Sequence, residues 1–283
     1  MLGLSLLLLV TTISSCVYGH YVFSRFLFNN TVTEQWEYVR NITLGQAIDS
    51  GLWDQYMPLY DIYSPDVRCG RGATTSGPAT RTASIVAGDE VGFVVGRSAD
   101  EVGAGQHSHF PLARETMKQI NLILMLRYQP MEPYIIYHNG PGQAYLSRST
   151  TDDTTAYEGD GDWFKVASLG ARNATDWLTR DQTSINFTIP ETTPPGQYLL
   201  RVEHLYVRYP FGTTQFYIAC AQIDVFPPSS GRKPRMPGPE YVVKFPGAYD
   251  LADAGIDVPE SIYDWPNSNL LQYKAPGPPV WTG

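Results

Sequence analysis

His20 is the residue whose position most directly indicates chemistry. Residues 2–10 form an uncharged apolar run, and small and polar residues follow as far as Gly19. This pattern predicts a secretory signal peptide over residues 1–19, too short to span a bilayer, with cleavage after Gly19. His20 would then be the N-terminus of the mature chain, and its α-amine and ring Nδ1 could bind one metal ion together. An internal histidine cannot form this chelate, so a metal site at His20 is one interpretation, and a histidine left first by chance after signal cleavage is the other.

Two other places in the chain carry residues that suit a metal. His138 lies where a strand-like run meets the Gly/Pro-rich turn HNGPG, which would leave its ring exposed. Gln215 and Tyr217 are two residues apart in an expected strand and therefore share a face, while Phe216 points to the other face. A chelating terminal histidine, a second histidine and a tyrosine oxygen suit copper. Zinc hydrolases usually carry carboxylate motifs such as HExxH, and the sequence contains none.

The cysteines and the glycosylation sequons agree with export. Cys16 lies in the predicted signal peptide, which leaves Cys69 and Cys220 as an even pair. In an oxidising compartment such a pair predicts one disulfide. We therefore expect a secreted, extracellular glycoprotein. The candidate glycosylation sites are Asn29, Asn41, Asn173 and Asn186.

The pattern of the segments that hold these residues predicts strands. Short or alternating apolar runs, rich in Val, Ile, Tyr and Phe, are separated by Gly, Pro and Asn. This pattern predicts an all-β protein, an immunoglobulin-like or fibronectin-like antiparallel β-sandwich with long loops. The expected strands cover residues 21–28, 82–95, 134–137, 163–169, 184–189, 197–207 and 215–226.

We expect a single catalytic β-sandwich domain over residues 20–283, without a carbohydrate-binding module. Residues 228–283 are rich in Pro and Gly but carry aromatic anchors, which predicts an extended segment wrapped on the sandwich. Residues 102–129 have helical periodicity inside a β chain, and we interpret them as either a retained intron or a genuine surface insertion. His107 and His109 are spaced like metal ligands but fall in this stretch, and we do not assign them as ligands.

The net charge of the chain excludes some classes of partner. It is −8 at neutral pH, which argues against binding to nucleic acid or to an anionic membrane. No feature of the sequence calls for a second protein chain, and we expect a monomer.

A series of motifs in a fixed order identifies a family. After His20 the series reads SPDVRC, AGDEVGF, HNGPGQAYLS, GDGDWFKV, IPETTPPGQYLLRVEH, QFYIACAQIDV, FPGAYDLADAGIDV and PGPPVW. It resembles the fungal copper-dependent lytic polysaccharide monooxygenases of auxiliary activity family nine, formerly classed as a glycoside hydrolase family. The resemblance implies that His20 and His138 hold one copper ion, as Cu(II) or Cu(I), with Tyr217 as its axial oxygen ligand. It implies that Gln215 donates a hydrogen bond to bound oxygen species, and it matches Cys69–Cys220 to a family disulfide.

The activity that the resemblance implies is oxidative cleavage of an insoluble polysaccharide, cellulose or an associated hemicellulose. A C–H bond beside the glycosidic bond is hydroxylated, with O2 or H2O2 as co-substrate and an external reductant as the electron donor. The AGDEVGF and RVEH segments resemble members that oxidise the anomeric carbon. Tyr263 in the C-terminal segment is the candidate for stacking on a sugar ring. The other interpretation is that Tyr263 anchors this segment to the sandwich.

Two positions depart from the family pattern. Arg208 stands where members usually carry a histidine near the metal, and Gly283 stands where many end in cysteine. An arginine stays protonated, so Arg208 could hold superoxide or peroxide electrostatically but could not act as a general acid. The alternative function is therefore a catalytically impaired copper-binding or carbohydrate-binding secreted protein.

Overall fold

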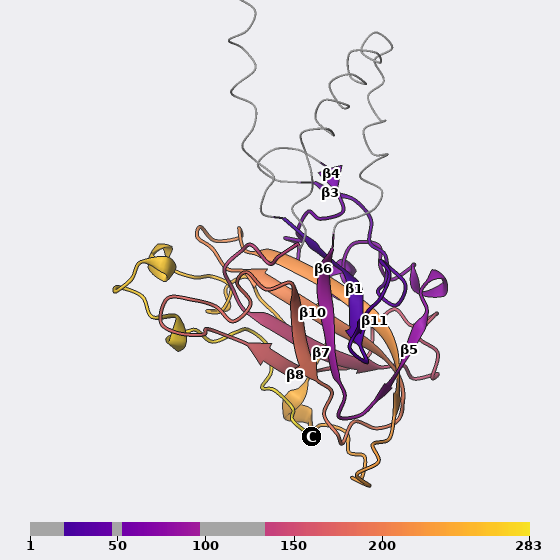
Figure 1. Cartoon of the computed structure of the whole chain (residues 1–283). Coiled ribbons are helices and arrows are strands. Elements are labelled where there is room, and N and C mark those ends of the chain that lie inside the picture. The colour runs from indigo at the N-terminus through magenta and orange to yellow at the C-terminus, as the bar shows by residue number, and fades with distance from the viewer. Residues whose placement is uncertain (1–19, 47–52, 97–133) are drawn as a thin grey trace, which may run out of the picture.

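The computed structural model describes residues 20–46, 53–96 and 134–283 (Figure 1). The predicted signal peptide, with Cys16, and the stretch 102–129, with His107 and His109, lie outside the described residues. In the part of the chain that is described, no helix is long and apolar enough to cross a membrane.

The strands form two main sheets. The four-stranded sheet has the order β2–β1–β6–β9, and the six-stranded sheet has the order β12–β8–β7–β10–β11–β5. The first sheet consists of β2 (Thr31–Val32), β1 (Val22–Phe28), β6 (Glu90–Gly96) and β9 (Ser184–Thr188). The second consists of β12 (Val242–Val243), β8 (Trp163–Leu169), β7 (Gly142–Arg148), β10 (Gly196–Tyr206), β11 (Gln215–Phe226) and β5 (Thr82–Val86).

Short elements connect or flank these sheets. β3 (Gly45–Gln46) and β4 (Trp53–Asp54) pair with each other in a separate two-stranded ladder. Within the described residues, the helical turns are all of the 3₁₀ type and no longer than four residues. They are η1 (Pro65–Val67), η2 (Gly77–Ala79), η4 (Pro239–Tyr241), η5 (Glu260–Tyr263) and η6 (Leu270–Gln272).

This architecture confirms the predicted all-β sandwich, with three local differences. β5 runs parallel to β11, whereas the other strand pairs are antiparallel. The expected strand 82–95 is two strands in different sheets, because the chain turns at Gly88, whose φ is +102°. Residues 134–137 form no sheet strand, since Ile136 instead exchanges backbone hydrogen bonds with the loop at 181–182. The strand of that region, β7, begins only after the HNGPG turn.

The central strands β10 and β11 are buried on both faces. Along β11, Tyr217 and Ala219 belong to the core between the two sheets, whereas Phe216 and Ile218 belong to a second core on the outer face. This alternation is the period of two that an extended strand requires. Gln215 and Tyr217 therefore share the inner face, as their spacing in the sequence predicts.

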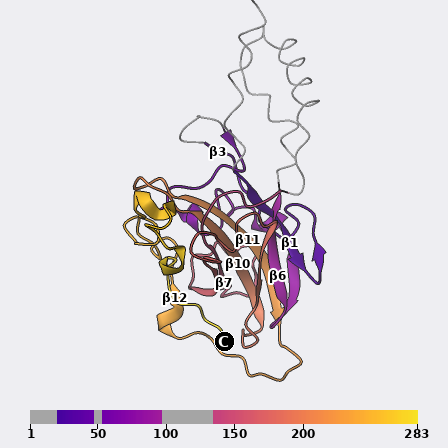
Figure 2. The ribbon, with the colours of Figure 1, turned by 60° about the vertical axis from the view of Figure 1, so that its left-hand side comes forward.

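The C-terminal segment covers the outer face of the six-stranded sheet. Figure 2 shows it on the side of that sheet opposite β1 and β6. The Lys165 ammonium donates a hydrogen bond to Pro276 O at 2.8 Å, and Trp281 N donates one to Lys165 O at 2.8 Å. These contacts fix the end of the segment to β8. The apolar residues that the segment adds to the outer core are Phe245, Tyr249, Ile256, Val258, Ile262 and Leu270.

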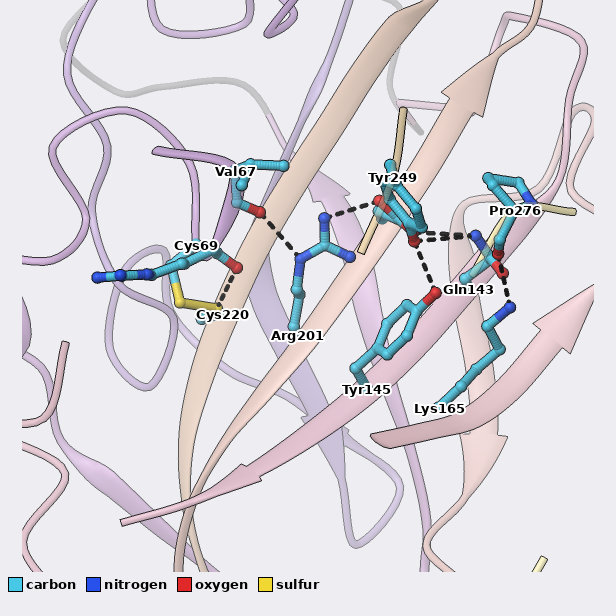
Figure 3. Close-up of polar contacts among 11 residues, drawn as sticks. Val67, Cys69, Gln143, Tyr145, Lys165, Arg201, Cys220, Tyr249 and Pro276 are labelled. Atoms are coloured by element: carbon cyan, nitrogen blue, oxygen red, sulfur yellow. Dashed lines mark hydrogen bonds and ion pairs between the residues drawn. A yellow bond between two sulfur atoms is a disulfide. The ribbon is translucent and has the colours of Figure 1, made fainter. Parts of the chain in front are cut away.

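A fully buried ion pair lies between β10 and this segment (Figure 3). Arg201 and Glu203 are both 0% exposed, and Arg201 Nη2 lies 2.7 Å from Glu203 Oε2. The hydroxyl of Tyr249 donates to the Glu203 carboxylate, and the Arg201 guanidinium lies 4.2 Å from the centre of the Phe245 ring. Two residues of the C-terminal segment thus complete the environment of a charge pair that belongs to the sheet.

The predicted disulfide between Cys69 and Cys220 is confirmed. It joins the loop after η1 to the outer face of β11, across a sequence separation of 151 residues. In the chain-entropy account, a loop of this length contributes about 5 kcal/mol by restricting the unfolded chain.

Glu203→Gln tests the buried ion pair. The substitution leaves the Arg201 charge without its counter-charge inside the protein, so we expect the free energy of unfolding to fall by about 3–5 kcal/mol. Glu191→Gln makes the same change in the exposed pair with Arg232 and should lower it by about 1 kcal/mol or less. Denaturant unfolding measures both variants, and equal effects would show that the buried pair does not hold this face together.

Candidate functional site

His20, His138 and Tyr217 come together at one edge of the sandwich. His20 precedes β1, His138 lies in the loop before β7, and Tyr217 is near the start of β11. The ring centroids are 5.7 Å apart for His20 and His138, 6.3 Å for His20 and Tyr217, and 5.8 Å for His138 and Tyr217. Both histidines are half-buried, whereas Tyr217 is buried. Three segments far apart in the sequence therefore meet around one small space.

The strand register places the His138 loop beside Tyr217. His204 of β10 pairs with Tyr217 on one side and with Gly142 on the other, so the loop that ends at Gly142 lies in the same row. The backbone at Gly140 passes so close to β10 that an added Cβ would lie 1.6 Å from Leu205 O. The φ of Gly140 is +153°, which favours glycine as well. The HNGPG turn is thus a close-packed support for His138.

The ring of His138 is held in a stack. It lies parallel to the Tyr206 ring, with 4.2 Å between centroids and 5° between planes. Burial, followed by the nearby His20 and His204, lowers the pKa of His138 from 6.5 to about 3. Its Nε2 atom is buried, and no described residue offers it a hydrogen bond. His138 is therefore a neutral imidazole with a ring nitrogen available to a further ligand.

Tyr217 is a neutral phenol inside a polar chain of contacts. Its ring stacks on Tyr21 with 4.2 Å between centroids, and burial raises its pKa well above the usual value. Its hydroxyl donates to Gln215 Oε1 at 2.6 Å, and Gln215 Nε2 donates to the Tyr60 hydroxyl at 3.1 Å. One of the two amide hydrogens of Gln215 is thus engaged within the protein.

Two tyrosines that the sequence analysis did not assign belong to this site. Tyr206 stacks on His138, and Tyr21 stacks on Tyr217 while its hydroxyl lies 2.6 Å from Nδ1 of the fully buried His204. Tyr21 could have been found from the sequence, because it directly follows His20 and must therefore lie close to it. Tyr206 lies two residues after His204, so the strand period places both on one face.

The remaining predicted residues lie around this centre. The Arg208 guanidinium is 5.5 Å from the centre of the Tyr206 ring, on the loop between β10 and β11. The Tyr263 hydroxyl donates to Val207 O at 2.7 Å and to Asn139 O at 3.3 Å, and the residue remains 37% exposed. The candidate glycosylation sites are all exposed, namely Asn29, Asn41, Asn173 and Asn186.

The donors at this edge fit a copper ion. The described residues contain no group of three or more His, Cys, Asp or Glu side chains that could hold a metal. A metal here would instead draw on two imidazole rings, the Tyr217 phenol oxygen and, after cleavage, the α-amine of His20. Neutral imidazole and amine nitrogens are donors that copper prefers.

The fold and this edge define a two-sheet β-sandwich protein with a candidate metal site. The family model described as Auxiliary Activity family 9 (formerly GH61) matches residues 20–273. The chain belongs to this family.

Relatives and solved structures agree with this assignment. The AA9 family lytic polysaccharide monooxygenase U of Thermothielavioides terrestris is 36% identical over 280 residues, which cover 94% of this chain and 93% of the relative. Monooxygenase G of Aspergillus tamarii is 35% identical and covers 100% of this chain and 72% of the relative. The crystal structure of HiLPMO9B matches the fold with a TM-score of 0.62 at 22% identity, over 93% of this chain and 100% of that one.

Gly140→Ala tests the support of the His138 loop. The new methyl group would collide with Leu205 O, so the loop must move and we expect the free energy of unfolding to fall by at least about 2 kcal/mol. Gly170→Ala adds the same methyl group where no atom lies within 4 Å, and it should be close to neutral. Thermal unfolding of both variants is the measurement. Similar melting temperatures would mean that the turn is less closely packed than the structure indicates.

Proposed function

We propose that this protein is a secreted copper-dependent monooxygenase that cleaves a polysaccharide, with cellulose as the expected polymer. The observation that carries the proposal is the meeting of His20, His138 and Tyr217 at one edge of a sandwich of this family. Its relatives are named lytic polysaccharide monooxygenases. A structure with a TM-score of 0.63 at 20% identity, over 93% of this chain and 100% of that one, is titled a cellulose-active polysaccharide monooxygenase from M. thermophila.

The geometry and the protonation states support the following ligand roles. The α-amine and ring of His20 and the ring of His138 would hold the ion, and the neutral Tyr217 phenol would supply an oxygen donor. When bound, copper supplies one-electron redox chemistry that uses O2 or H2O2, and electrons from an external reductant, to oxidise a C–H bond beside the glycosidic bond. Tyr206 fixes the plane of the His138 ring, and Tyr21 fixes that of Tyr217.

Gln215 and Arg208 would interact with small molecules in the space beside the metal. The second amide hydrogen of Gln215 could be donated to an oxygen co-substrate in that space. Arg208 lies near the Tyr206 ring and stays protonated, so it attracts an anion such as superoxide but releases no proton. Oxidation at the anomeric carbon, which yields aldonic acids, is the regiochemistry that we propose.

The position of the site suits a polymer that lies across a surface. His20 and His138 are half-buried at the edge of the sandwich, and Tyr263 is 37% exposed close to the His138 loop. The Tyr263 hydroxyl is committed to backbone carbonyls, so the face of its ring is what remains for a sugar. An insoluble polysaccharide cannot enter a deep cleft but can reach a metal at such an edge.

A second candidate is a binding protein that holds copper or carbohydrate without turnover. Arg208 favours it, because an arginine in that place cannot deliver a proton. Reduction of the copper-loaded protein in the presence of O2 distinguishes the two candidates. Formation of hydrogen peroxide supports the enzyme, and tight copper binding without peroxide supports the binding protein.

The free terminus of His20 is the first test. A variant that keeps Gly19 converts the α-amine into an amide, so we expect copper affinity to fall by orders of magnitude in titration calorimetry. For the mature protein, affinity should decline as the pH drops below neutrality, because the amine, with a reference pKa of about 7.7–8.0, must lose its proton to bind. One extra glycine after Gly283 is the matched control and should have no effect. Equal affinity with and without Gly19 would contradict the ligand assignment.

Activity on polymers is the second test. Mature copper-loaded protein, incubated with cellulose and ascorbate, should release oxidised oligosaccharides that mass spectrometry identifies as aldonic acids. His138→Ala should release none, whereas Tyr217→Phe should keep its copper and lose only part of its rate, since only one oxygen donor is lost. The absence of oxidised products on cellulose, xylan and xyloglucan would rule out the proposed enzyme.

A further inference from the structure

Two arginines flank His138, and each lies on an aromatic ring that contacts this histidine. The Arg180 guanidinium is 4.7 Å from the centre of the Tyr137 ring, and that ring is inclined by 76° to the His138 ring with 5.9 Å between centroids. The Arg208 guanidinium is 5.5 Å from the centre of the Tyr206 ring, which stacks on His138 at 4.2 Å. Both positive charges are therefore one aromatic ring away from a proposed copper ligand.

Backbone hydrogen bonds hold the Arg180 segment against the stretch that leads to His138. Ile136 N donates to Gln182 O at 2.8 Å, and Asp181 N donates to Ile136 O at 3.0 Å. The loop between β8 and β9 thus carries Arg180 to the side of the candidate site where Tyr137 lies.

Arg208 is held by the loop between β10 and β11. Its N–H donates to Thr214 Oγ1 at 3.3 Å, and the Thr213 hydroxyl donates to Arg208 O at 3.4 Å. The Thr214 hydroxyl in turn donates to Ile256 O at 2.9 Å, which ties this loop to the C-terminal segment. The main chain therefore fixes the place from which each arginine reaches toward His138.

The two arginines differ in their charge partners. Arg180 Nε lies 3.1 Å from Asp181 Oδ1, but the Asp181 side chain is 63% exposed, so water weakens this pair. Among the residues that the structure describes, no carboxylate forms an ion pair with Arg208. The space beside His138 is therefore a local positive region on a chain whose net charge is −8.

An uncharged polymer does not account for this positive region. Cellulose carries no charge, whereas the proposed function also needs an electron donor that arrives from solution. A carboxylate or an enediolate can accept two parallel hydrogen bonds from the planar fork of a guanidinium group. A small organic anion of this kind is the ligand that the two arginines match in both charge and shape.

We propose that Arg180 and Arg208 form a binding site for a small organic anion, a carboxylate or an enediolate, and that this is the class of the external electron donor. The use as a donor rests on the proposed function, whereas the anion site itself needs no metal. Ascorbate held there would lose one electron to Cu(II), which becomes Cu(I), and one proton to water. The two arginines bind and orient the donor and take no part in the proton transfer.

Nuclear magnetic resonance of the metal-free mature protein measures this binding directly. Ascorbate, added without oxygen at constant ionic strength, should shift the Nε–H signals of both arginines. Arg180→Gln and Arg208→Gln should each weaken binding about twofold to threefold at low salt, as expected for one charge removed at about 10 Å.

Two further variants separate charge from structure. Asp181→Asn removes the opposing charge and should strengthen ascorbate binding about twofold, and asparagine accepts the φ of +59° at this position. Arg232→Gln changes the net charge of the chain as Arg208→Gln does. Arg232 forms an exposed pair with Glu191 and follows β11 at the strand end opposite Gln215, so this control should bind as the native protein does.

Reduction of the copper-loaded protein tests the role as a donor site. In stopped-flow measurements, Arg208→Gln should slow reduction by ascorbate about threefold at low salt and leave reduction by neutral hydroquinone unchanged. In about 1 M salt, where the screening length is about 3 Å, the native protein and the variant should react equally with ascorbate. Equal slowing with both reductants would show a structural effect and contradict the proposal.

The outcomes are distinct from those of the proposed function. Native ascorbate affinity in both arginine variants would overturn the anion site even if the protein cleaves cellulose. Phosphate that binds as tightly as ascorbate and displaces it would assign the site to inorganic anions, and the organic donor would be wrong. If the proposed function fails, no oxidised oligosaccharides form, yet ascorbate binding to the metal-free protein would still support the anion site.

Discussion

The antiparallel pairing of β10 with β11 determines where the other parts of the site lie. The two strands pair without a break from Gly196 opposite Val225 to Tyr206 opposite Gln215. Both strands are buried on both faces, so a slip of one residue would move every side chain into the wrong core. Such a slip would place Phe216 where Tyr217 faces the histidines. The register is therefore strongly specified by packing, and the site follows from it.

The same pairing connects the site with the outer face of the sheet. On β10, Arg201 and Glu203 point outward into the buried network of Figure 3, while His204 points inward to Tyr21. The C-terminal segment that supplies Tyr249 to this network continues to Trp265 beside the His138 loop. One buried charge pair thus helps to anchor the segment whose Tyr263 hydroxyl bonds to Asn139 O in the His138 loop.

The sequence predicts what depends on residue type and local spacing. It places Gln215 and Tyr217 on one face and singles out His20 and His138, because few side chains have their chemistry. It does not predict the stack of Tyr206 on His138. It also does not predict that residues 134–137 lie outside the sheets and that the strand of this region, β7, begins only at Gly142. Those depend on which distant strands pair and in what register, and periodicity gives the face of a residue but not its partner. The family motifs add the expected roles of these residues, whereas the ring stacks on His138 and Tyr217 are seen only in the folded structure.

Burial gives the proposed metal site its electrostatic character. It raises the pKa of Tyr217 and lowers that of His138, which favours the neutral form of both donors. Arg208 adds another positive charge, 5.5 Å from the Tyr206 ring that stacks on His138. The chain as a whole carries −8, yet charges farther away than the screening length of about 8 Å at physiological salt count little. The approach of a small anion to the proposed metal site would therefore be governed by Arg208 and the metal, since an arginine at this place offers a permanent attraction and no proton transfer.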